Sequence, residues 1–146
     1  MEKTLVLIKP DAIQRGLVGQ IITRYEQKGL ILVGMKMIQL DDRILDEHYS
    51  HLNGKSFFPR IKEFMKSTPV IVSCWTGVDA VQTVRKTTGT TLSRDANPGT
   101  VRGDFGMSVQ ANLIHASDTL ENALVELERF FSKDEIFTFV HSNLDN

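Results

Sequence analysis

Short apolar runs alternate along this chain with segments whose apolar residues recur at helical spacing. The runs at residues 4–8, 30–40, 70–75 and 107–115 predict strands, and the segments at 16–28, 42–52, 59–67, 78–88 and 119–131 predict helices. The resulting order is strand, helix, strand, helical hairpin, strand, helix, strand, helix, which corresponds to two split β-α-β units. We therefore expect an α+β fold, a ferredoxin-like split βαβ sandwich in which helices cover a four-stranded antiparallel sheet.

Length and composition are those of one globular domain. The chain has 146 residues, 41% hydrophobic and 24% charged, so residues 1–146 are predicted to form a single domain with its own core. A net charge of -1 provides no broad positive surface for nucleic acid or an anionic membrane. No apolar stretch is long enough for a signal peptide or a bilayer span. Cys74 is the only cysteine and lies in an apolar run, which predicts a buried thiol in a reducing compartment, by default the cytoplasm.

Two of the helical segments have apolar faces that we expect to point into the core. These faces comprise Val78, Val81 and Val84 in residues 78–88, and Leu120, Ala123, Leu124, Leu127, Phe130 and Phe131 in residues 119–131. Asp118 followed by Glu121 predicts an N-cap and a capping box for the second helix. Between the two helices, residues 89–106 show no period and contain Pro98 and several glycines, which predicts a long functional loop.

The sequence around His115 combines the end of a strand with the start of a helix. An apolar run from Val109 leads to this histidine, and Asp118 then begins the last helix, whose first backbone N–H groups would lie close to the imidazole. Such a corner suits a phosphoryl group or another anion beside a histidine. The local pattern alone leaves open that His115 only fills the end of a strand.

Other motifs exclude some kinds of site and leave scattered candidates. The sequence contains neither a G-x-x-x-x-G-K-[ST] phosphate loop nor a Rossmann fingerprint. His48 and His51 form the only pair at metal-ligand spacing, and because they lack a third partner we predict no metal site. The remaining candidates are a cation after the first strand, two arginines, a hydroxyl and an aromatic corner: Lys9, Arg85, Arg102, Thr91 and Phe57-Phe58. Each also has an ordinary structural interpretation, as helix surface, turn or core.

Taken together, six segments resemble the nucleoside diphosphate kinase family in order and spacing. They are residues 9–11 (KPD), 14–19 (QRGLVG), 47–49 (EHY), 57–58 (FF), 98–105 (PGTVRGDF) and 112–118 (NLIHASD), and the resemblance covers residues 3–131. It implies a ping-pong reaction in which the γ-phosphate of a nucleoside triphosphate, mainly ATP, passes to a histidine and then to a nucleoside diphosphate. A neutral imidazole can make this attack without a separate base.

The resemblance also implies roles for individual residues. His115 would carry the phosphoryl group, Glu126 would hold its imidazole, and Ser117 and Tyr49 would lie near the transferring group. The residues that it implies for nucleotide binding are Lys9, Phe57, Ile61, Arg85, Thr91, Arg102, Val109 and Asn112. Lys9, Arg85, Thr91 and Arg102 would hold the phosphates, and Lys9, which would also act in catalysis, would reach the ribose together with Asn112. Phe57 would stack on the base with Val109 and Ile61 as apolar cover, which predicts broad base specificity.

The implied cofactor is Mg²⁺, carried by the nucleotide phosphates and not by protein ligands. The implied partners are nucleoside tri- and diphosphates and further copies of the chain, in a hexamer or a tetramer. The sequence departs from the family pattern at Gln110-Ala111 before Asn112, at Leu92-Ser93 after Thr91 and at Ala116 after His115. The first two departures lie in or near a loop that contributes to subunit contacts in the family, so the type of assembly stays open.

Two other functions remain open at this level. The chain could act as a nucleotide-dependent scaffold or regulator, or it could transfer phosphate from the same His115 to acceptor proteins. Retention of the whole set of implied catalytic and binding residues favours the enzyme, because a scaffold need not keep all of them.

Overall fold

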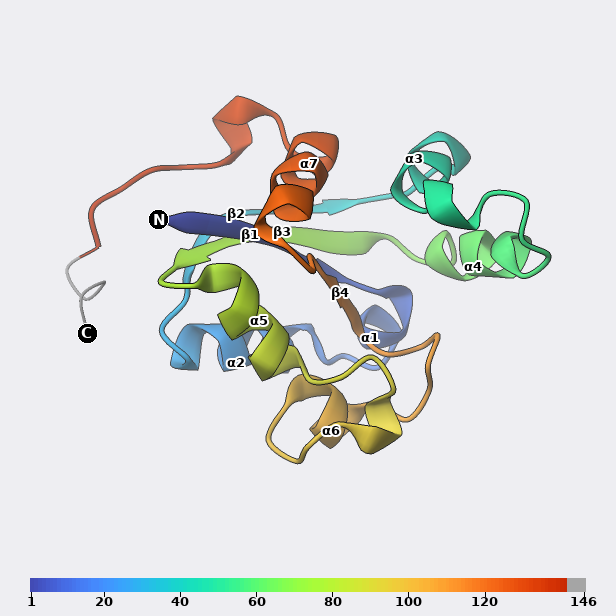
Figure 1. Cartoon of the computed structure of the whole chain (residues 1–146), viewed down its shortest axis with the longest axis horizontal. Coiled ribbons are helices and arrows are strands. Elements are labelled where there is room, and N and C mark those ends of the chain that lie inside the picture. The colour runs from blue at the N-terminus through green and yellow to red at the C-terminus, as the bar shows by residue number, and fades with distance from the viewer. Residues whose placement is uncertain (142–146) are drawn as a thin grey trace.

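A four-stranded antiparallel sheet forms the centre of the computed structural model, which describes residues 1–141 (Figure 1). Its strands are β1 (Glu2–Ile8), β2 (Ile31–Ile38), β3 (Val70–Gly77) and β4 (Ile114–Ala116), in the order β2-β3-β1-β4. The inner strand β1 places Leu5 opposite Cys74 of β3 and Leu7 opposite His115 of β4. The predicted α+β sandwich with a four-stranded antiparallel sheet is therefore confirmed.

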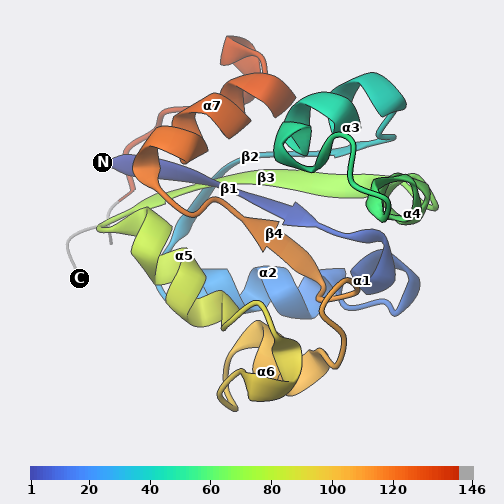
Figure 2. The same cartoon turned by 45° about the vertical axis from the view of Figure 1, so that its right-hand side comes forward.

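Helices cover both faces of this sheet. They are α1 (Pro10–Gln14), α2 (Val18–Gln27), α3 (Asp42–His48), α4 (Phe58–Met65), α5 (Ala80–Thr88), α6 (Val101–Phe105) and α7 (Leu120–Phe130), with 3-10 turns η1 (Ser50–Leu52), η2 (Ser93–Asp95) and η3 (Lys133–Glu135). Figures 1 and 2 place α2 and α5 against one face and α3 and α7 against the other. Within residues 1–141, no helix has both the length and the apolar character that crossing a membrane requires.

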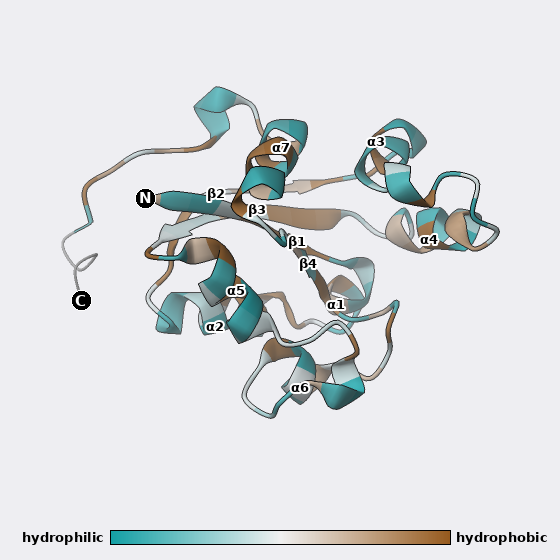
Figure 3. Cartoon of the chain, viewed as in Figure 1, coloured by the Kyte–Doolittle hydropathy of each residue, from teal (hydrophilic) through white to brown (hydrophobic). Residues whose placement is uncertain are grey.

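The alternation of side chains along β1 divides the core into two clusters. Val6 and Ile8 point to the face of α2 and α5, where Trp75 is buried, whereas Leu5 and Leu7 point to the face of α3 and α7. Figure 3 shows hydrophilic and hydrophobic residues within both α5 and α7, as expected for helices that bury one side. The Cys74 thiol is free and fully buried in the second cluster, as predicted.

The chain between α5 and β4 differs most from the prediction. The strand predicted over residues 107–115 covers only Ile114–Ala116, and Val109 in the preceding irregular segment is 57% exposed. Residues 89–106 are not a structureless loop, since they contain η2 and α6. The last helix has Thr119 as its N-cap, which accepts from the Asn122 backbone N–H, whereas Asp118 accepts from the Asn122 side chain. The predicted cap was therefore wrong by one residue.

Several apolar residues predicted to face the core are instead exposed. Val78 is 68% exposed because α5 begins only at Ala80. Leu120 and Leu124 are 44% and 55% exposed, although they share the apolar stripe of α7. The buried residues of α7 are Ala123, Leu127 and Phe130. The face of α7 that contacts the sheet is therefore narrower than the apolar face predicted from the sequence. The short helix α1, next to the end of β1, was not predicted.

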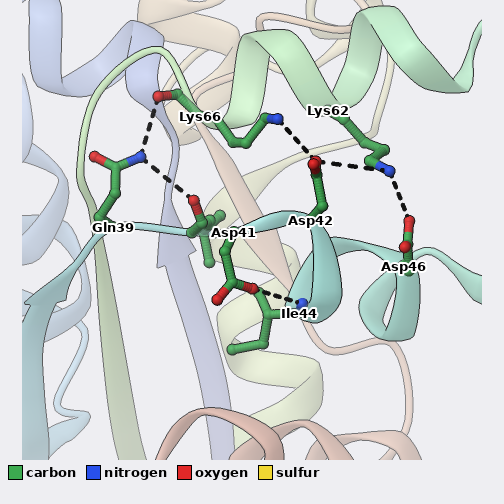
Figure 4. Close-up of polar contacts among 8 residues, drawn as sticks. Gln39, Asp41, Asp42, Ile44, Asp46, Lys62 and Lys66 are labelled. Carbon is green, nitrogen blue, oxygen red and sulfur yellow. Dashed lines mark hydrogen bonds and ion pairs between the residues drawn. The ribbon is translucent and has the colours of Figure 1, made fainter.

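Charged side chains join the outer surfaces of the helical hairpin of α3 and α4, as Figure 4 shows, while Leu45 and Met65 of the two helices share the second core cluster. Lys66 lies 2.7 Å from Asp42, and Lys62 lies 2.8 Å from Asp46. Asp41 caps α3 by accepting from the Ile44 backbone N–H, as predicted. This hairpin carries the residues from 49 to 61 that take part in the cleft described below.

Candidate active site

One cleft of about 1010 Å³ brings together residues from distant parts of the chain. The end of β1, the α3–α4 hairpin, α5, the irregular segment before β4 and α7 all contribute side chains to it. Of the predicted site residues, it is lined by Lys9, Tyr49, Phe57, Ile61, Arg85, Thr91, Arg102, Val109, Asn112, His115 and Glu126. Ser117 does not line the cleft, because it is fully buried behind Glu126.

His115 is oriented by a carboxylate on α7. Its Nε2 lies 2.9 Å from Glu126 Oε1, and the Ser117 hydroxyl donates to the same oxygen over 2.6 Å. Burial raises the pKa of Glu126, but the hydrogen bonds and charge of its neighbours outweigh this and lower it to about 2. The ionised carboxylate can only accept, so His115 Nε2 carries the proton and Nδ1 keeps a lone pair.

A second histidine lies beside His115. His48 is only 8% exposed, and its ring centroid is 4.6 Å from that of His115. Arg129 Nη1 lies 2.9 Å from His48 Nδ1. The sequence did not lead us to predict Arg129 as a site residue, although it follows Glu126 by three residues on one helix and so lies on the same face. Potential ligand atoms of His48, His115 and Glu126 lie within 4.8 Å of one another. We assign them no metal, because these hydrogen bonds account for the cluster and the guanidinium would repel a cation.

The predicted pair of His48 and His51 does not form a unit. His51 is exposed, whereas His48 turns into the cluster with His115 and Glu126. His48 ends α3 and His51 lies in the following turn η1, so their close spacing in the sequence does not bring the two rings to one site.

Two cations, the partly buried Lys9 and the buried Arg102, occupy the end of the cleft next to the irregular segment. Lys9 Nζ donates to the Gln110 carbonyl and to Asn112 Oδ1, both over 2.9 Å. Burial lowers the pKa of Lys9 to about 8, although the Asp11 charge opposes this. Arg102 donates to three backbone carbonyls, those of Gly89, Asn112 and Ile114. Burial lowers its pKa to about 10, so at neutral pH it remains a cation, with further N–H groups beyond these three bonds.

The backbone just before His115 adopts an unusual conformation. Leu113 is fully buried with φ of 79°, and the Ile114 N–H donates to the Asn112 carbonyl over 2.9 Å, which closes a γ-turn. Asp11 Oδ2 accepts from the Leu113 N–H, and the Leu113 carbonyl accepts from the Lys9 N–H. These contacts with the end of β1 hold a conformation that a leucine rarely adopts, and they explain why β4 begins only at Ile114.

The open mouth of the cleft is apolar and aromatic. Phe57 is 48% exposed and Val109 57% exposed, whereas Phe58, next in sequence, is 5% exposed and belongs to the core. Burial, with the charge of Glu126, raises the pKa of Tyr49 to about 12, so its hydroxyl remains a donor at neutral pH. The arrangement can therefore accept a flat ring at the mouth and an anion beside the cations.

Comparisons with known proteins agree on one family. The family model described as nucleoside diphosphate kinase matches residues 2–136. The nucleoside diphosphate kinase of Parabacteroides distasonis is 60% identical over 144 residues, 99% of this chain and 94% of the relative, and that of Saccharomyces cerevisiae is 43% identical over 135 residues, 92% and 88%. A solved halophilic nucleoside diphosphate kinase from Halobacterium salinarum in complex with CDP superimposes with a TM-score of 0.92 at 42% identity, over 97% of this chain and 94% of that one. The chain belongs to the nucleoside diphosphate kinase family.

Proposed function

We propose that His115 is the phosphoryl carrier of the ping-pong reaction that is the general activity of this family. The observation that carries the proposal is the bond from His115 Nε2 to the ionised Glu126, in a cleft that also holds Lys9 and Arg102. This bond leaves the Nδ1 lone pair as the only nucleophilic position of the ring.

The chemistry then needs no separate base. His115 Nδ1 attacks the γ-phosphorus, a nitrogen–phosphorus bond forms, and the bond to the β-phosphate oxygen breaks, so that a nucleoside diphosphate leaves. A β-phosphate oxygen of a second nucleoside diphosphate reverses these steps. The barrier falls because Lys9 and Arg102 offset negative charge and Glu126 keeps the ring in place.

The other cleft residues suit nucleotide binding. Arg85 and Thr91 would meet the phosphates, Tyr49 would donate to the transferring group, and Asn112 and Lys9 would contact the ribose. The exposed Phe57 ring would stack on the base, with Val109 and Ile61 as apolar cover. Stacking accepts every base, so this arrangement supports broad specificity.

The cleft also fits a Mg²⁺ ion that arrives on the nucleotide. Its charged lining is rich in cations, and Glu126 is already engaged by two donors. Such a lining suits phosphates better than a bare divalent ion, which prefers phosphate oxygens and water. When bound, the ion would offset phosphate charge, and chelation of Mg²⁺ should remove the transfer activity.

We also propose that the chain assembles into a hexamer or a tetramer. The Val33 carbonyl of the edge strand β2 already accepts from the Phe137 N–H, but Met35 and Met37 of this strand are 49% and 58% exposed, and exposed apolar side chains favour contact with a second copy. Light scattering at several protein concentrations would measure the assembly.

The buried free thiol of Cys74 is compatible with the predicted cytoplasmic location.

The test of the proposed function compares the unaltered protein with His115→Ala. Both are mixed with ATP and Mg²⁺, and the experiment follows acid-labile phosphate on the protein and its passage to GDP. We expect the unaltered protein to be labelled and to form GTP, and His115→Ala to do neither. A protein that binds nucleotide but carries no phosphate would overturn the proposal and favour a scaffold.

A further inference from the structure

His48 and Arg129 form a pair beside His115 to which the reaction described above gives no role. His48 ends α3, and its ring meets that of His115 edge-on at 87°, with a centroid separation of 4.6 Å. The rings of Tyr49 and Phe130 enclose His48 at centroid distances of 4.8 and 5.3 Å. One side of the His115 imidazole therefore rests on His48, so the placement of His48 affects that of His115.

The hydrogen bond from Arg129 determines which nitrogen of His48 carries the proton. Arg129 Nη1 lies 2.9 Å from His48 Nδ1, and a guanidinium has donors but no acceptor. Nδ1 must therefore be unprotonated and accept, which places the proton of the neutral ring on Nε2. In this tautomer the only lone pair of His48 is occupied by Arg129, so His48 cannot attack phosphorus as His115 does.

The groups around His48 also oppose its protonation. His115 faces it from β4, Glu126 and Arg129 from α7, and His51 from η1. Burial first, then the charges of His115, Arg129 and His51, lower the pKa of His48 to about 3, with Glu126 acting in the opposite direction. A protonated His48 would compete with His115 for Glu126, and this arrangement prevents it.

Arg129 connects the two helices that flank His115. It follows Glu126 by three residues on α7, so the two side chains lie on neighbouring turns of the same face. One face of α7 thus supplies the carboxylate for His115 and the guanidinium for His48. Arg129 Nε also lies 3.3 Å from Glu47 of α3, and only 12% of the Arg129 side chain is exposed.

We propose that Arg129 is a positioning residue, which holds His48 as a neutral, non-nucleophilic support against the ring of His115. The inference deepens the proposed function, because it rests on His115 as the carrier. Without Arg129, His48 can exchange its tautomer, one of the charges that oppose its protonation is lost, and its ring no longer gives His115 a fixed surface.

The test uses Arg129→Leu, which removes the donors, Arg129→Lys, which keeps a positive donor, and Glu128→Gln, an exposed control on the same helix. The rate of phosphoenzyme formation is measured against pH, together with the affinity for ADP. For Arg129→Leu we expect a rate about tenfold lower at neutral pH, an acid limb moved to higher pH and unchanged ADP affinity. Arg129→Lys should recover most of the rate, and Glu128→Gln should match the unaltered protein.

Two results would overturn the proposal. One is a normal rate and pH profile for Arg129→Leu. The other is a loss of ADP affinity without a change in the maximal rate, since that would make Arg129 a direct phosphate ligand in the cleft.

A measurement on the unaltered protein tests the same idea without any substitution. Nitrogen NMR of the imidazoles should show His48 protonated at Nε2 and unprotonated at Nδ1, and a proton on His48 Nδ1 would contradict the proposal. Failure of the carrier assignment is seen separately, as phosphate on the His115→Ala protein.

Discussion

The two walls of the cleft are built in different ways. On one wall, His115, Glu126 and Lys9 are held by hydrogen bonds between buried or partly buried groups at the end of β1, on β4 and on α7. On the other wall, the α3–α4 hairpin is joined by ion pairs of exposed side chains such as Asp42 and Asp46. Exposed pairs of this kind contribute little to stability, whereas buried polar networks fix geometry.

This difference matches two physical requirements of the proposed reaction. Attack at phosphorus requires positions correct to a fraction of an ångström, which the buried wall provides. Stacking on a base requires an accessible aromatic ring but not the precise placement of atoms that a hydrogen bond needs. The exposed ring of Phe57 on the hairpin meets this requirement. We therefore expect substitutions on the buried wall to lower the rate and substitution of the exposed Phe57 of the hairpin to lower nucleotide affinity.

The largest effect should come from Glu126→Gln on the buried wall. Glutamine keeps one oxygen that can accept, but it lacks the negative charge that strengthens both bonds, and its NH2 group can only donate. The imidazole therefore loses the partner that fixes its tautomer. We expect phosphoenzyme formation to slow by about 100-fold or more, with ADP affinity retained, as measured in a rapid-mixing experiment. Glu128→Gln on the same helix serves as the control. A Glu126→Gln protein with the normal rate would mean that the carboxylate does not orient His115.

A smaller and different effect should follow from Phe57→Ala on the hairpin. Loss of the stacking surface should raise KM by about tenfold for purine and pyrimidine nucleotides alike, with kcat unchanged. The matched variant Phe58→Ala removes a ring that is 5% exposed, so it should instead destabilise the fold by about 3 kcal/mol in denaturant unfolding. Equal effects of the two variants on KM would contradict the proposal that the exposed Phe57, and not the core residue Phe58, stacks on the base.

The smallest effect should be a pH dependence of nucleotide affinity that arises from Lys9. Its pKa in the free protein is lowered to about 8, and a bound polyphosphate favours the protonated amine, so the pKa rises in the complex. The contribution of Lys9 is therefore fully present below pH 8 and declines above it, by at most about tenfold per pH unit. Calorimetric titration with ADP between pH 6 and 10 measures this slope. Lys9→Arg should remove it, and a slope that persists in Lys9→Arg must come from another group.

Much of the fold was predictable because local rules and tertiary packing agree there. The β-branched run that became β1, the helix cap at Asp41 and the apolar run around Cys74 all took the predicted form. The segment before His115 was mispredicted because its apolar residues suit a strand, whereas bonds from Lys9 and Asp11 hold it in a γ-turn. These partners lie about a hundred residues earlier in the chain, so no local pattern can indicate them.

The same division applies to the cleft. The sequence by itself determined the family, the strand that carries His115 and the set of residue types needed to bind a nucleotide, because these follow from motifs and their spacing. Only the tertiary structure decided that Ser117 lies behind Glu126, that Arg102 binds three backbone carbonyls, and that Arg129 fixes the tautomer of His48. Those contacts join elements distant in sequence, and a hydrogen bond forms only where folding brings donor and acceptor within reach of each other.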